Sequence, residues 1–108
     1  MAQIALIIKH QTLPGRRDEV RQVWERHMAT AITANSEHLA YFYCFDNSDA
    51  DAIYAFQHYA SVEASEEFLK TESYLAYLTD VEPLLAKPAE VTLLTPVWLK
   101  RHLNRSSF

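Results

Sequence analysis

Hydrophobic and polar positions alternate along the chain in patterns that predict six elements. β-branched and aromatic runs indicate strands, and apolar residues recurring every three or four positions indicate helices. Between two aromatic runs, the polar stretch "DNSDAD" favours a hairpin loop through Asp, Asn and Ser turn chemistry. The predicted elements are strands at 3–11, 38–46, 52–59 and 91–101, and helices at 16–35 and 61–85, the second broken near 71–73.

This order, β-α-β-β-α-β, is typical of the α+β ferredoxin-like fold, in which two helices cover one face of a four-stranded antiparallel sheet. The strand at 38–46 directs Tyr41, Tyr43 and Phe45 to one face and Phe42 and Cys44 to the other. An antiparallel sheet with one solvated face should alternate apolar with polar residues. Because both faces are apolar, we predict a homodimer through the sheet face.

Composition narrows the class of protein. The 108 residues fit a single domain at 1–101, followed by a polar, basic tail at 102–108 that we expect to be flexible. A net charge of −4 argues against a nucleic-acid partner, and no apolar stretch approaches the roughly 18 residues that span a membrane. The lone Cys44 indicates a cytoplasmic protein, and a single glycine excludes Gly-rich phosphate loops.

Histidines and aromatic residues are the candidates for chemistry. His27 follows Trp24 by one turn on the apolar stripe of the first helix, where a histidine either bonds a core neighbour or serves as a pocket base. His10 and His38 stand at strand ends and are expected to be solvated, and His58 is expected to be structural or interfacial. No two histidines have the spacing of metal ligands, so no metal is predicted. Aromatic candidates for a pocket wall are Trp24, Tyr43, Tyr74 and Trp98.

The chain resembles the antibiotic biosynthesis monooxygenase family, and within it the quinol-monooxygenase branch. The residues that carry the resemblance are "IYAFQHYASVEASEEFLKTESYLAYL" (53–78) and "PLLAKPAEVTLLTPVWLK" (83–100). The resemblance implies a dimeric α+β barrel and oxidation of phenolic or enolic substrates by O₂, often without metal or flavin. Such a protein supplies a base, a polar anchor for a developing oxyanion and a dry pocket.

One motif departs from the family pattern. Where many members carry histidines in the second helical region, this chain has Phe68 and Ser73. If the family's base lies there, another residue replaces it, the reaction needs no base from this segment, or the protein binds without oxidising.

The leading hypothesis is therefore a cofactor-free monooxygenase acting on a small quinol-like or phenolic substrate. In it His27 is the base, and the substrate-binding residues are Trp24, Tyr43, Tyr74, Phe68 and Trp98. Two alternatives remain: a non-catalytic module that binds a small aromatic ligand, and an isomerase or an enzyme that degrades a small signalling ketone on the same scaffold.

Overall fold

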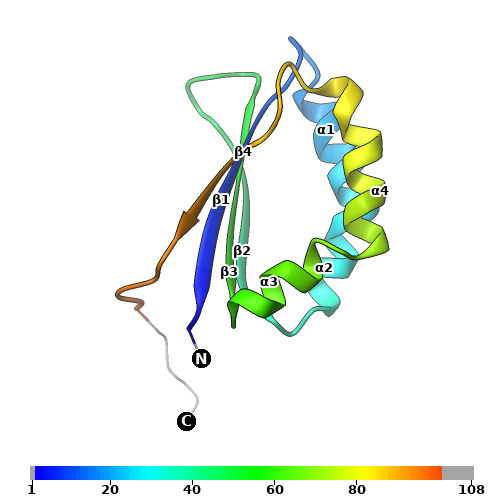
Figure 1. Ribbon diagram of the computed structural model, residues 1–108. Helices are drawn as coiled ribbons and strands as arrows, with labels where there is room; N and C mark the ends of the chain where they lie inside the picture. The colour runs from blue at the N-terminus through cyan, green and yellow to red at the C-terminus, as the bar shows by residue number, and fades with distance from the viewer. Residues whose placement is uncertain (1, 101–108) are drawn as a thin grey trace.

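A computed structural model describes residues 2–100. Its four strands form one antiparallel sheet in the order β2-β3-β1-β4, and all helices lie on one face of it (Figure 1). The strands are β1 (Ile4–Gln11), β2 (His38–Phe45), β3 (Ala52–Tyr59) and β4 (Glu90–Leu94). The helices are α1 (Arg17–Trp24), η1 (Glu25–Ala29), α2 (Thr30–Ala34), α3 (Val62–Phe68), α4 (Glu72–Val81) and η2 (Glu82–Leu84). The predicted ferredoxin-like fold is confirmed.

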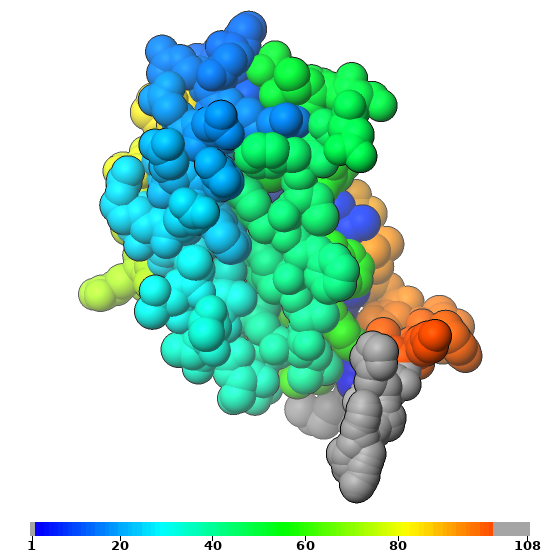
Figure 2. Space-filling model, turned by 180° about the vertical axis from the view of Figure 1, so that it is seen from behind, coloured from blue at the N-terminus to red at the C-terminus, as the bar shows by residue number. Residues whose placement is uncertain are grey.

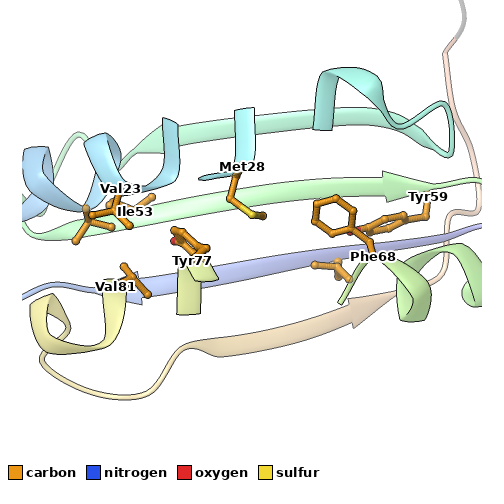
Figure 3. Packing of buried hydrophobic residues seen from close by; sticks show 9 residues of the cluster. Val23, Met28, Ile53, Tyr59, Phe68, Tyr77 and Val81 are labelled. Carbon is orange, nitrogen blue, oxygen red and sulfur yellow. The ribbon is translucent and has the colours of Figure 1, made fainter. Parts of the chain in front are cut away.

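Apolar side chains between the sheet and the helices form the core (Figure 3). Ile53 and Tyr59 enter it from β3, and Val20, Phe68 and Val81 enter it from the helices. Burying one such side chain contributes roughly 1.5–3 kcal/mol, so this layer holds the helices against the sheet. The hydroxyl of Tyr59 donates to Gln57 Oε1 at 2.6 Å, which satisfies a polar group inside the core.

The second helical region is broken at 69–71, close to the break predicted near 71–73. Ser61 begins α3 by accepting a hydrogen bond from the Ala64 amide at 3.0 Å. Thr71 caps α4 in the same way, accepting from the Tyr74 amide at 3.2 Å. Because each cap satisfies an N–H group that a helix start leaves free, the two caps produce two short helices instead of one.

The first helical region differs from the predicted uniform helix. A π-helical segment, η1, separates α1 from α2. A π turn holds one more residue than an α turn, so side chains after Trp24 are rotated relative to the expected period.

The last strand is shorter than predicted. β4 pairs with β1 only as far as Leu94, opposite Ala5, and β1 itself begins at Ile4. Residues beyond Leu94 therefore have no strand to pair with, and Pro96 has no N–H to donate. Residues 95–100 stand away from the body of the molecule (Figure 2). The predicted tail at 102–108 lies outside the described residues.

The hairpin loop between β2 and β3 is anchored to the start of α1. Arg17 donates to three carbonyl groups, those of Asp46, Asp49 and Ala52, at 2.9–3.3 Å. The Gly15 amide donates to the Asp51 carboxylate at 3.0 Å, and Gly15 adopts a positive φ of 77° that other residues rarely adopt. These bonds hold the polar loop against the start of α1 at one end of the sheet.

The sheet face opposite the helices has no helix over it in the protomer, and it carries large apolar side chains that are exposed. Phe42 is 59% exposed there, and its ring meets that of Phe56 edge-on at 6.1 Å. Cys44 is exposed on the same strand, two residues further on, and therefore on the same face.

Candidate functional site

A small enclosed cavity of about 40 Å³ lies between the sheet and the helices. We call it the inner cavity. Aromatic side chains dominate its wall, and none of the lining side chains carries a formal charge. The lining residues are Ile8, His10, Trp24, Met28, Tyr41, Tyr43, Ala55, Gln57, Tyr74, Tyr77, Leu78, Ala89 and Val91. Three of the predicted pocket residues, Trp24, Tyr43 and Tyr74, are therefore brought together here.

His10 is the one imidazole in this wall. It is only 5% exposed, which corrects the expectation that it is solvated. Its Nε2 lies 2.9 Å from the hydroxyl oxygen of Tyr77, and its Nδ1 has no hydrogen-bond partner among residues 2–100. Burial lowers the pKa of His10 from 6.5 to about 4, because the charged imidazolium loses its hydration. His10 is therefore neutral at pH 7, and its Nδ1 is the ring nitrogen left without a partner.

Three aromatic residues form a stacked group beside His10. The Trp24 and Tyr43 rings stack with centroids 4.2 Å apart, and Trp24 Nε1 donates to the Tyr41 hydroxyl oxygen at 3.2 Å. The Tyr43 hydroxyl has no hydrogen-bond partner in the described part of the chain. Burial raises the pKa of Tyr41 to about 12 and also raises that of Tyr43. Both hydroxyls therefore keep their protons at pH 7 and can donate to an anion that forms nearby.

His27, the base predicted from the sequence, lies outside the inner cavity. Its Nε2 is 2.7 Å from Asp80 Oδ2 on α4, and Arg26 approaches the same carboxylate at 3.7 Å. Met28 of the π-helical segment lines the cavity together with Trp24 of α1, whereas His27 of the same segment faces the neighbouring helix α4. In this position His27 links the first helical region to α4.

Phe68 and Trp98 are also away from the inner cavity. Phe68 is 4% exposed and packs edge-on against His38 with centroids 4.6 Å apart, so it belongs to the core. Trp98 is 82% exposed in the segment after β4, where strand pairing has ended. The half-buried His38 was expected to be solvated, and burial instead lowers its pKa.

Several larger hollows open to solvent, and two of them are lined by candidate site residues. The one we call the outer hollow has a volume of about 390 Å³ and lies between α4 and the start of β4. It shares three lining residues, His10, Leu78 and Ala89, with the inner cavity. A groove of about 570 Å³ between α2 and α3 is larger but shares none, and its only ionisable side chains are glutamates. The chemistry at His10 therefore favours the inner cavity and outer hollow over the larger groove.

The buried histidine makes a prediction about stability. Above pH 6.5 His10 is neutral in both the folded and the unfolded chain, so its protonation does not change the free energy of unfolding there. Between pH 6.5 and about 4 the unfolded chain binds a proton that the folded chain rejects, so the free energy of unfolding falls as the pH falls. We expect chemical denaturation at both ends of this pH window to show that the free energy of unfolding falls by about 3 kcal/mol more in the wild type than in His10→Gln. Equal losses in the two proteins would contradict the buried neutral state.

No three His, Cys, Asp or Glu side chains within residues 2–100 gather into a metal site. Over the same residues, no helix has the length and hydrophobicity needed to cross a membrane.

The family model for antibiotic biosynthesis monooxygenases matches residues 3–80. The chain belongs to the antibiotic biosynthesis monooxygenase family. No curated protein matches it in sequence. A solved structure from Mycobacterium tuberculosis is 26% identical, with a TM-score of 0.80 over 91% of this chain and 98% of that one. A member of the same family from Chloroflexus aurantiacus is 24% identical, with a TM-score of 0.78 over 92% and 97% of the two chains. Another from Caulobacter crescentus is 18% identical, with a TM-score of 0.83 over 90% and 92%.

The predicted family is therefore confirmed. The similarities to the structures from Chloroflexus aurantiacus and Caulobacter crescentus, both below 25% identity, support the fold alone. Among the residues of the inner cavity, the sequence alone did not single out His10 as a site residue. A signal for it was present, since Ile4, Leu6, Ile8 and His10 alternate onto the face that meets the helices.

Proposed function

We propose that the protein is a cofactor-independent monooxygenase acting on a small quinol-like or phenolic substrate. The observation that carries the proposal is the buried, neutral His10, whose Nδ1 is free in a wall of aromatic and uncharged side chains. Membership of the family supports the class of reaction. The quinol-like substrate fits because an uncharged aromatic wall suits a neutral ring.

His10 is the proposed base. In the tautomer whose Nε2–H donates to the Tyr77 oxygen, the Nδ1 lone pair accepts the proton of a substrate hydroxyl. A pKa of about 4 describes the empty site, and the phenolate formed beside the ring raises it by stabilising the imidazolium. The Tyr41 and Tyr43 hydroxyls donate to the phenolate oxygen. We no longer assign this role to His27, because its Nε2 already contacts Asp80.

The proposed reaction balances without a further reductant. The deprotonated ring gives an electron to O₂, and the resulting radical and superoxide combine through a new carbon–oxygen bond. Loss of the proton from that ring carbon, with cleavage of the O–O bond, then leaves one oxygen atom on the ring and releases the other in water. A hydroquinone thus becomes a hydroxyquinone, with all four electrons for the reduction of O₂ supplied by the ring.

Oxygen uptake with a panel of hydroquinones tests this function. We expect uptake that depends on the protein, and with isotopically labelled O₂ one labelled atom in the product and one in water. Binding of hydroquinones without uptake would support the second candidate, a non-catalytic binding module. That candidate is favoured by Phe68, a core residue at a position where the family often has histidine.

We also propose that the protein is a homodimer that pairs through the outer face of the sheet. Phe42 is exposed on this face, and Phe56 lies beside it. The helices cover only the other face of the sheet (Figure 1). A second copy of the same face would bury these side chains and complete the layered packing that a two-faced apolar sheet requires.

We also propose that the protein is located in the cytoplasm, because of the cysteine on this face. Cys44 is the single cysteine of the chain, and its thiol is exposed and free. A free exposed thiol is stable where the surroundings are reducing, as they are in the cytoplasm.

A further inference from the structure

We propose that the outer hollow holds the substrate ring and its substituent, and that Leu78 and Glu82 select substituents that are apolar and not anionic. This inference rests on the proposed function, because it takes the substrate to be a phenol or quinol whose hydroxyl meets His10.

The volumes of the inner cavity and the outer hollow indicate where an aromatic ring can bind. A dry cavity needs on the order of 150 Å³ to take up benzene, and the inner cavity has about 40 Å³. The inner cavity can receive a hydroxyl group but not an aromatic ring. The outer hollow, at about 390 Å³, lies within the usual range of ligand pockets. Because His10 lines both spaces, a ring in the outer hollow can present its hydroxyl to the imidazole at their boundary.

Leu78 stands at the same boundary. It projects from α4, is 39% exposed and lines both spaces. Most of the remaining wall of the outer hollow is apolar, formed by Val81, Leu85, Pro88 and Ala89. A ring that meets His10 must therefore pass along Leu78, and an alkyl substituent on that ring would rest on apolar side chains.

Among residues 2–100, Glu82 supplies the only charge in the wall of the outer hollow. No Lys or Arg side chain of the described part of the chain lines it, and Lys87, which lies nearby in the sequence, pairs with Glu90 at 3.1 Å. A carboxylate on the substrate would meet a like charge here without a compensating cation, which disfavours anionic substituents.

Calorimetric titration with phenol, para-butylphenol and para-hydroxybenzoate tests the inference without requiring turnover. Leu78→Trp fills the outer hollow and should weaken para-butylphenol binding at least ten-fold. Its matched control, Leu75→Trp, changes an exposed leucine of the same helix that lines neither space and should leave binding unchanged. Glu82→Gln should strengthen para-hydroxybenzoate binding about three-fold, the scale of an exposed charge pair, whereas Glu72→Gln should not.

Each outcome decides the inference. Wild-type affinity of Leu78→Trp for para-butylphenol, equal weakening by Leu75→Trp, or no binding of either neutral phenol to the wild-type protein would overturn it. The expected binding pattern without oxygen uptake from hydroquinones would uphold the ligand site and refute the proposed oxidation. The two proposals therefore fail separately.

Discussion

Replacing His10 by Gln is expected to lower the rate of quinol-dependent oxygen uptake by at least about a hundred-fold, the usual contribution of a general base. Glutamine can accept a hydrogen bond but cannot take the substrate proton at neutral pH. The substitution leaves a polar group opposite Tyr77, so that the buried hydroxyl keeps a possible partner. Oxygen consumption under saturating hydroquinone is the measurement, with circular dichroism to verify that the fold is retained.

Two matched substitutions sharpen the result. His58 is as buried as His10, but its side chain lies on the outer sheet face and contacts Gln3 at 2.8 Å, so His58→Gln should keep turnover near the wild-type rate. His27→Ala removes the bond to Asp80 and should also leave turnover within about three-fold of wild type, since solvent-exposed ion pairs contribute little. Full activity in His10→Gln together with loss of activity in His27→Ala would show that His27, the base predicted from the sequence, has this role.

The histidines show where sequence reasoning succeeds and where it stops. The alternation of side chains along a strand places His10 on the helix-facing side of β1. Its position near the strand end had instead indicated a solvent-exposed side chain. Helical periodicity placed His27 with Trp24, but His27 lies in the π-helical segment that follows Trp24, and this segment changes the period. Such a segment depends on tertiary packing, and no residue in it marks it in the sequence.

The order of elements and the faces of the strands could be predicted because they depend on local patterns. The end of β4 could not, because it depends on where β1 begins, far away in the chain. Trp98 falls beyond that end, which is why an aromatic residue that fitted the strand pattern is not near the inner cavity. The volumes of the inner cavity and the outer hollow likewise depend on packing between distant elements.

Replacing Phe42 by Asp is expected to convert the proposed dimer into a monomer. Phe42 is exposed in the protomer, so the substitution costs the isolated fold little. In the proposed dimer its ring is buried beside Phe56, and a carboxylate there would lie unpaired in an apolar interface. The dimer dissociation constant should rise by at least about a hundred-fold, as it does when a central aromatic contact of an interface is lost. Sedimentation velocity at micromolar concentration measures it.

The control introduces the same charge on the opposite side of the molecule. Leu75 is an exposed leucine on α4, so Leu75→Asp should remain dimeric. A dimeric Phe42→Asp protein, or a monomeric wild type, would refute pairing through the sheet. The monomeric variant would also separate assembly from chemistry. His10 and the outer hollow lie on the helix side, so phenol binding should persist in it, and a loss of binding would mean that the partner subunit helps to shape the site.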